Sequence, residues 1–429
     1  MTSTLVAPYL PSHVRPLRAR RNVLANVVAN VVAPSLSTPE AAVAAVFAAV
    51  RQRGPVARDT IAALSGLSVA TVNRQVSALL EAQLLRERPD LAAAGAIGRP
   101  RIPVEINHEP YLTLGVHVGA RTTSIVASDL FGRALDAVET PTPGGSQAAA
   151  LAALADSARR YLSRWHRRRA LWAGVTIGGV VDSAGGYVDH TRLGWSRAPL
   201  GPVLAGVLGL PVSVASHVDA MAGAELLLGT HPRRGSGLYV YARETVGFAL
   251  VIDGRVHSPA SGPGTVAGLP VQSDLLGGSG QLESTVSDEA VVAAARRTGI
   301  LPATGPNSAM TALLRVARQR DGAAASGARA LLAERARVLG GAVALIRDML
   351  NPDDLVVGGQ AFTEYPEGLD RLRASFAERS LLAAKDIRVT AFGNRVQEAG
   401  ASVVSLSSIY ADPLASLRRA RQTSARRAV

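Results

Sequence analysis

The chain has 429 residues, of which 48% are hydrophobic, and it carries a formal net charge of +13. This length is sufficient for two or three domains. Cysteine does not occur in the sequence, which excludes disulfides, cysteine nucleophiles and thiolate metal sites. The longest apolar run, residues 41–50, is much shorter than the roughly 20 residues of a membrane span, and the first residues lack the pattern of a signal peptide. We therefore expect a cytoplasmic protein without a membrane partner.

The positive charge is concentrated at the two ends of the chain. Residues 1–105 contain 12 Arg and 6 acidic residues, whereas residues 415–429 contain 5 Arg and no acidic residue. A basic head and a basic C-terminal tail on a nearly neutral body favour contact with nucleic acid. A solvated tail beside a soluble helical domain would have the same charge distribution.

The first 105 residues are predicted to be mainly helical. An N-terminal extension, residues 1–39, has helical periodicity over 19–33, for which dimer contact is a hypothetical role. Further helices are predicted over 40–53, over 58–64 and over about 13 residues after Ser68, which is a favourable N-cap. Two short strands follow on either side of the Ala/Gly-rich segment 91–98. Residues 40–105 are thus expected to form one domain.

Residues 57–85 have the spacing of a helix-turn-helix unit. Ala62 is small where the two helices must pack closely, and Gly66 occupies the turn, where a positive φ costs little. An ordinary helical hairpin with one polar face would show a similar pattern. Apolar residues at helical spacing would form the seam between the helices: Ile61, Leu64, Leu67, Val72, Val76, Leu79 and Leu80.

The start of the second helix carries side chains that suit the major groove of DNA. Asn73, Arg74 and Gln75 are candidates for base edges, because Arg pairs with guanine and Asn or Gln with adenine. Ser68 and Thr71 are candidates for backbone phosphates. The full set of candidate DNA-contact residues is Arg58, Ser68, Ala70, Thr71, Asn73, Arg74, Gln75, Arg99 and Arg101.

Arg99 and Arg101 belong to this set because the two strands would convert the unit into a winged helix-turn-helix. The wing ends in Gly98-Arg99-Pro100-Arg101, and an Arg held extended beside Pro suits a narrow minor groove. The alternative is a basic linker to the next domain.

From residue 106 onward the sequence alternates between strands and helices. Strands are predicted in the stretches 111–120, 122–132, 133–141, 171–186, 211–216 and 235–254, and again at 355–359. Helices are predicted over 147–169, 217–228, 287–298, 308–319 and 326–350. This alternation, with Gly at strand ends, predicts an α/β fold for residues 106–414.

The ordered landmarks of the chain closely resemble those of the ROK family, which comprises repressors, open reading frames and kinases. The matching stretches are LGVHVGARTTSIVASDLFG (114–132), GVTIGGVVDSAGG (174–186), LGWSRAPL (193–200), PVSVASHVDAMAGAELLLG (211–229), LEST (282–285), LNPDDLVVGG (350–359) and EAGASVVSL (398–406). The resemblance implies an N-terminal winged helix-turn-helix and a two-lobed, actin-like (ribonuclease H-like) sugar-kinase fold.

The residues that ROK kinases use for phosphoryl transfer are replaced. The acid of the first phosphate hairpin is His117, and the second glycine-rich phosphate turn contains Arg243 and Glu244. The Asn-Asp pair, whose Asp is the kinase base, is Ser216-His217. Since phosphoryl transfer depends mainly on charge stabilisation, the resemblance implies a body that is not an enzyme.

The sugar and zinc motifs of the family are altered as well. The Glu and His of the Gly-Glu-Ile-Gly-His motif fall on Thr265 and Gly268, and the zinc-loop cysteines fall on Asp274, Leu276 and Gln281. We therefore expect no zinc, and no ATP or magnesium. Trp195, Ser216, His217, Asp219 and Thr265 remain candidates for an effector pocket. The alternative is that Trp195 is cleft packing and that the pocket is silent.

The sequence thus predicts a transcriptional regulator located in the cytoplasm and associated with the nucleoid. The main hypothesis is a repressor of carbohydrate-related genes, a homodimer or homotetramer bound to an inverted-repeat operator in double-stranded DNA, with a sugar or sugar derivative as candidate effector. The alternatives are an active or residual carbohydrate kinase with an added head and an effector-independent DNA-binding regulator.

Overall fold

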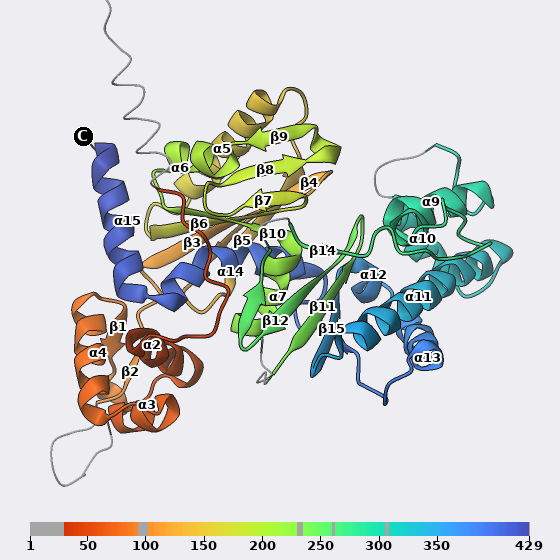
Figure 1. The fold of residues 1–429 in the computed structure, drawn as a ribbon. Coiled ribbons are helices and arrows are strands. Elements are labelled where there is room, and N and C mark those ends of the chain that lie inside the picture. Colours follow the sequence, from red (N-terminus) through yellow and green to blue (C-terminus); the bar gives the residue numbers. More distant parts are fainter. Residues whose placement is uncertain (1–29, 93–101, 230–234, 260–261, 305–308, 429) are drawn as a thin grey trace, which may run out of the picture.

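The computed structural model describes residues 30–92, 102–229, 235–259, 262–304 and 309–428. A small helical head and two larger α/β lobes are arranged around a pair of central helices (Figure 1). Among the described residues, no helix combines the length and apolar character needed to cross a bilayer. The fold is α/β, with an N-terminal winged helix-turn-helix and a two-lobed, actin-like body.

The head consists of three helices and a two-stranded antiparallel sheet. Its elements are α2 (Ala42–Arg53), α3 (Arg58–Ser65), α4 (Val69–Glu81), β1 (Leu85–Glu87) and β2 (Val104–Ile106). The predicted turn glycine, Gly66, has φ +69° and ends α3. The three predicted helices and both strands are thus present in the described part of the head.

The first lobe contains a five-stranded sheet in the order β10-β6-β3-β4-β5. Its strands are β3 (Tyr111–Val118), β4 (Thr122–Ser128), β5 (Ala134–Pro141), β6 (Arg169–Ile177) and β10 (Val212–Ser216). A second, three-stranded sheet consists of β7 (Val180–Asp182), β8 (Tyr187–His190) and β9 (Trp195–Ala198). The helices of this lobe are α5 (Gln147–Ser163) and α6 (Leu200–Leu208), and α5 ends six residues before the predicted boundary at 169.

The second lobe contains a six-stranded sheet. Five of its strands follow the order β13-β12-β11-β15-β16, and the sixth, β14, pairs with β12. The strands are β11 (Gly237–Ala242), β12 (Val246–Ile252), β13 (Arg255–His257), β14 (Gly264–Thr265), β15 (Asp354–Gly358) and β16 (Arg388–Val389). The helices are α8 (Leu282–Val286), α9 (Asp288–Arg297), α10 (Ala309–Ala317), α11 (Ala323–Leu350), α12 (Gln360–Thr363) and α13 (Leu369–Arg379).

Two helices, α7 (His217–Leu228) and α14 (Val396–Ala411), pack against each other between the lobes. Helix α14 covers the first sheet and α7 covers the second. Gly115 permits the close approach of α14 to β3, because a Cβ on it would lie 2.8 Å from the carbonyl carbon of Ala401. The neighbouring residues Leu114 and Val116 point to the opposite face and join the core with α5 and α6.

At the ends of the chain, the structure corrects one expectation and rules out one alternative. Of the helix predicted over 19–33, residues 19–29 lie outside the described residues, and residues 30–33 are not helical, with Val31 bridged to Val212. At the other end, α15 (Pro413–Ala428) is a helix rather than a solvated tail, because Leu417, Ala420 and Thr423 are buried along one side of it. In Figure 1, α15 extends upward from the head along the first lobe.

Candidate nucleic-acid interface and central cleft

Helix α4 presents a polar face that the rest of the head leaves exposed. Ser68 caps the helix, since its Oγ accepts a hydrogen bond from the Thr71 backbone N–H at 3.2 Å. On the inner face Val72 and Val76 are fully buried, whereas Asn73 and Arg74 on the outer face are exposed. An exposed polar face at the start of this helix is the geometry with which winged heads enter the major groove.

The other predicted DNA contacts of the head differ in their exposure and in their partners. Thr71 and Gln75 are half-buried, and Ser68 and Ala70 are exposed. Arg58 is held within the head, because its guanidinium donates to Asn73 Oδ1 at 3.5 Å and lies 3.6 Å from the Glu87 carboxylate.

Two apolar residues near this face differ from the sequence analysis. Leu64, predicted in the seam, is 48% exposed, so it is not part of the packed seam. Val69, the first residue of α4, is 54% exposed and is not among the predicted contacts. The position of Val69 directly after the N-cap marks it as a candidate DNA contact, because an apolar side chain there suits a thymine methyl group.

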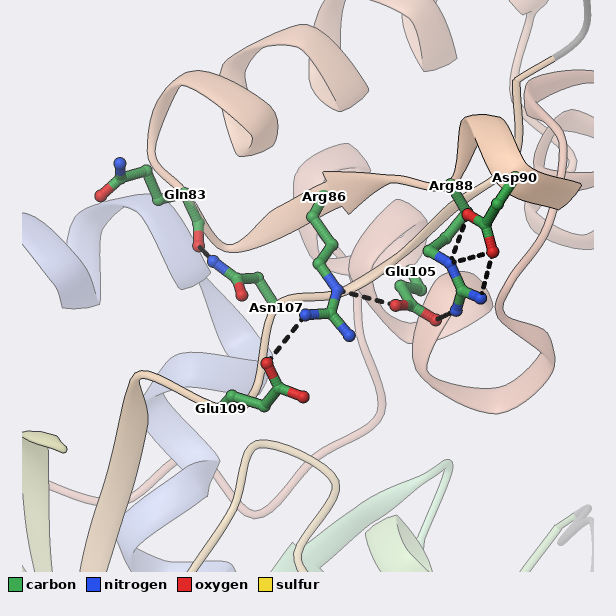
Figure 2. Close-up of polar contacts among 7 residues, drawn as sticks. All are labelled: Gln83, Arg86, Arg88, Asp90, Glu105, Asn107 and Glu109. Atoms are coloured by element: carbon green, nitrogen blue, oxygen red, sulfur yellow. Dashed lines mark hydrogen bonds and ion pairs between the residues drawn. The ribbon is translucent and has the colours of Figure 1, made fainter. Parts of the chain in front are cut away.

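The base of the wing is a network of arginine and carboxylate side chains (Figure 2). The Glu105 carboxylate accepts from Arg86 Nε at 2.7 Å and from Arg88 Nη1 at 2.9 Å. Arg86 also donates to Glu109 at 2.9 Å, and Arg88 pairs with Asp90 at 2.7 Å. The two guanidinium groups hold the pKa values of Glu109 and Asp90 below their usual range.

This network leaves the described part of the wing with little free positive charge. The predicted wing contacts, Arg99 and Arg101, lie outside the described residues. The turn that leads into the wing is fixed separately, because Asn107 Nδ2 donates to the backbone carbonyl of Gln83, a residue with φ +62°, at 2.8 Å.

The head is joined to the body by a continuous apolar core. Phe47 and Val50 of α2 belong to the same cluster of buried residues as Tyr410 of α14 and Leu417 of α15. The rings of Phe47 and Tyr410 have centroids 6.4 Å apart. The orientation of α4 is therefore set by packing against the body and not only by a linker.

A cavity of about 400 Å³ lies between the lobes at the predicted kinase-like cleft. Three histidines line it: His117, His190 and His217. Burial lowers the pKa of His117 to about 3 and that of His217 to about 4, so both are neutral at pH 7. His117 Nδ1 lies 2.9 Å from Thr176 Oγ1, whereas His217 Nε2 is buried without a hydrogen-bond partner.

Side chains occupy the second phosphate turn of this cleft. Arg243 donates to Gln397 Oε1 at 3.1 Å and lies 3.8 Å from Asp288, which in turn accepts from the buried Arg335 at 2.6 Å. Glu244 lines the cavity directly. The side chains of Arg243 and Glu244 thus stand in this turn, where the family kinases have glycine backbone facing the phosphates.

One carboxylate connects the two lobes at the rim of the cleft. Glu289, on α9 of the second lobe, accepts from Arg121 at 2.6 Å and from Arg192 at 3.0 Å, and both arginines belong to the first lobe. We refer to these three residues as the inter-lobe clasp. All three side chains are between one third and one half exposed.

The five residues of the predicted effector pocket do not form one site. His217 and Thr265 line the central cavity. Ser216 and Asp219, on the other side of the first turn of α7, line a second cavity. Trp195 is 4% exposed and packs in the core of the first lobe, because β9 directs its ring inward, so it does not contribute to the cleft.

The positions of the family zinc loop carry side chains with other roles in the fold. Leu276 is buried in an apolar cluster with Val291 and Leu313, and Gln281 forms a β-bridge with Pro270. Across the residues that the structure describes, no group of three His, Asp or Glu side chains is arranged to hold a metal ion.

Comparison with known proteins connects this geometry to a family. Residues 113–406 match the ROK family. The chain is 68% identical over 426 residues to the transcriptional regulator Mb0495 of Mycobacterium bovis, covering 97% of this chain and 94% of that protein. It is 23% identical over 222 residues to the DNA-binding transcriptional repressor Mlc of Escherichia coli, covering 51% of this chain and 54% of Mlc.

A solved structure agrees over nearly the whole chain. The crystal structure of a ROK family transcriptional regulator, a homolog of E. coli Mlc, superposes with a TM-score of 0.70 at 21% identity, covering 89% of this chain and 98% of that one. The head, the two lobes and the central helices are thus found in one known architecture. The chain belongs to the ROK family.

Proposed function

We propose that this transcriptional regulator of the ROK type is a sequence-specific repressor of carbohydrate-related genes. The observation that carries the proposal is the exposed polar face of α4, where Asn73 and Arg74 stand free of the packed inner face. The 68% identity to a protein named as a transcriptional regulator supports the same conclusion. The operator would be an inverted repeat in double-stranded DNA, bound by a homodimer or homotetramer.

The kinase-like body of this regulator does not transfer phosphoryl groups. Three features support this part of the proposal: a buried neutral His117 at the position of the family acid, and the side chains of Arg243 and Glu244 in the second phosphate turn. Glu244 would repel a triphosphate, and Arg243 is already engaged with Gln397. The body would need no ATP, magnesium or zinc, and would serve in oligomerisation and effector sensing.

The central cavity is the place where a sugar or sugar derivative would bind as effector. His217 and Thr265 line it, and the unpartnered Nε2 of His217 is available to a ligand hydroxyl. An effector changes DNA binding only if it binds one arrangement of the lobes better than the other. A regulator of this kind acts in the cytoplasm, at the nucleoid.

The direct test is binding of the full chain to DNA from its own promoter region, with a scrambled duplex of equal length at the same salt concentration. We expect a clear preference for the promoter duplex, protected in two symmetric half-sites. Arg74→Ala should reduce discrimination at one base pair by about 1–3 kcal/mol. Equal affinity for both duplexes would contradict the proposal.

A second assay tests the body. The chain is incubated with ATP, magnesium and a panel of sugars, and ADP release is followed. We expect no release above the blank. Sustained release that is lost in His217→Ala would show an active carbohydrate kinase instead.

A further inference from the structure

A second cavity, of about 1130 Å³, lies beneath the segment that enters the head. We call residues 31–40 the strap. Its side of the cavity is formed by residues 33–37 and Glu40, and the opposite walls are formed by residues 181–184, by the start of α7 and by residues 252–259. The strap continues directly into α2, the first helix of the head. A molecule in this cavity would therefore touch the connection between body and head.

The strap is attached to both lobes. At one end, the Val32 N–H donates to the carbonyl of Val212, in β10 of the first lobe, at 2.9 Å. At the other end, the Thr38 N–H donates to the carbonyl of Gly254 at 2.8 Å, in the β12–β13 hairpin of the second lobe, and Glu40 pairs with Arg255 at 2.8 Å. Relative movement of the lobes would therefore pull on the strap, and a ligand beneath it would oppose or favour that movement.

Two buried polar side chains in the wall of this cavity each have an atom without a hydrogen-bond partner, although the Asp219 carboxyl group also forms a hydrogen bond with Ser258. Ser216 and Asp219 are each only 5% exposed, and neither Ser216 Oγ nor Asp219 Oδ1 has a hydrogen-bond partner. Buried polar atoms in folded proteins are nearly always paired, so unpaired ones in a cavity wall indicate the place of a ligand. A carboxylate oxygen accepts hydrogen bonds only, which requires a ligand group that donates them.

The charge of the walls specifies the ligand further. Four carboxylates line the cavity, on Glu40, Asp182, Asp219 and Asp253. The only Lys or Arg side chain among the described lining residues is Arg255, which is already paired with Glu40. This excess of negative charge at a buried acceptor favours a cationic donor.

We propose that the cavity beneath the strap binds a small molecule with a protonated primary amine, whose N–H groups donate to Asp219 and Ser216. The site is separate from the central cavity: among the described lining residues, the two cavities share only residues 262 and 263. The proposal that an amine binds here depends only on the cavity and not on the proposed function. The effect of the bound amine on DNA affinity, through the strap and α2, rests on the proposed function.

Binding is tested on the full chain by calorimetry and thermal shift. The probes are putrescine, spermidine and glucosamine, each beside its fully N-acetylated form, in which every amine is an uncharged amide enlarged by an acetyl group. We expect saturable binding of at least one amine and at least tenfold weaker binding of its acetylated form. Failure of all three amines to bind, or equal binding of the acetylated form, would overturn the proposal.

Two variants locate the site. Asp219→Asn should weaken amine binding at least tenfold, whereas Glu244→Gln, the same chemical change in the central cavity, should leave it unchanged. Ser183→Trp, in the loop after β7, should block the cavity without altering the buried carboxylate. Retained binding in both Asp219→Asn and Ser183→Trp, or its loss in Glu244→Gln, would place the amine elsewhere.

Coupling to the head is a separate measurement. With a bound amine, we expect the affinity for the promoter duplex to change at least threefold in the unmodified chain and not in Asp219→Asn. Amine binding with unchanged DNA affinity would overturn the coupling but not the site. A chain that never prefers its promoter would contradict the proposed function, while calorimetry would still decide whether the amine site exists.

Discussion

Arg51, in the last turn of α2, donates a hydrogen bond from Nη2 to the backbone carbonyl of Leu227 in the last turn of α7, over 2.8 Å. The same guanidinium lies 4.4 Å from the centroid of the Tyr410 ring. Carbonyl groups at a helix C-terminus have no partner within the helix, and a cation there also interacts favourably with the helix dipole. Helix α7 begins at His217 in the central cleft, so this one helix connects the cleft to the head.

Replacing Arg51 should loosen the head without unfolding it. Arg51→Met keeps much of the aliphatic stem but removes the hydrogen bond to Leu227 and the cation over Tyr410, at a cost of about 1.5–3 kcal/mol. We expect faster hydrogen exchange in residues 42–56 and weaker promoter binding with unchanged sequence preference. Arg53→Met, at an exposed position on the same helix, is the control. Equal exchange in both variants would show that Arg51 does not hold the head.

The carboxylate of Glu105 should restrain the affinity of the wing for DNA. It neutralises Arg86 and Arg88, so Glu105→Gln removes one negative charge and leaves two arginines more available to phosphates. We expect tighter non-specific binding and a salt dependence steeper by about one to two phosphate contacts. The measurement is affinity for random duplex across a salt series, with Glu81→Gln, an exposed acid at the end of α4, as control. An unchanged slope would show that these arginines do not face DNA.

The sequence was most informative where local rules decide the structure. The N-cap at Ser68, the left-handed Gly66 and the helix over 217–228 follow from local patterns, and the structure has all three. The inward position of Trp195 could not be predicted in this way, because it depends on which face of β9 the first lobe covers. Leu64 was misassigned for a similar reason, since its exposure depends on how α3 meets its neighbours.

Pairings between residues far apart in the chain could not be predicted from local sequence patterns. The apolar spacing of residues 31–33, the first part of the strap, favours a helix, but Val32 pairs instead with the edge of β10, about 180 residues away. A free sheet edge offers backbone hydrogen bonds that no local propensity can anticipate. Separation of Ser216 and Asp219 from His217 likewise depends on where the strap and the β12–β13 hairpin meet.

Acid should destabilise the protein through the buried histidines. Their pKa values, about 3 for His117 and about 4 for His217, lie below 6.5, the usual value. Stability is therefore fully present above pH 6.5 and is lost as the pH falls toward 4, because the unfolded chain takes up protons that the folded chain does not. Each group should cost up to about 2 kcal/mol between pH 6.5 and pH 5.

The measurement is denaturant unfolding of His217→Gln and of the unmodified chain at both pH values. Between pH 6.5 and pH 5, His217→Gln should lose less unfolding free energy than the unmodified chain, whatever the two values are at pH 6.5. His166→Gln, at an exposed histidine, should lose as much as the unmodified chain. Identical losses in all three proteins would show that His217 takes up protons in the folded state.

The inter-lobe clasp should bias the lobes toward closure. Glu289→Gln weakens the pairs with both Arg121 and Arg192. Exposed ion pairs contribute about 0.2–1 kcal/mol each, so the unfolding free energy should change little while the open arrangement becomes more populated. Small-angle scattering should show a larger radius of gyration, with Glu367→Gln, an exposed acid of the second lobe outside the clasp, as control. An unchanged radius would indicate that the central helices alone fix the lobes.

The buried carboxylate of Asp219 should lower the stability of the protein at neutral pH, relative to a variant with Asn at this position. Burial raises the pKa of Asp219 to about 6, although a hydrogen bond with Ser258 and the proximity of His257 act in the opposite direction. The folded protein holds this proton more tightly than the unfolded chain, in which the pKa is about 3.8. The carboxyl group therefore costs stability as the pH rises from 3.8 through 6.

Asp219→Asn should thus raise the unfolding free energy at pH 7.5 by up to about 3 kcal/mol, and by much less at pH 4. Asp321→Asn, at an exposed position, should be neutral at both values. An equal gain for Asp219→Asn at pH 4 and pH 7.5 would show that the change acts through packing and not through the buried charge.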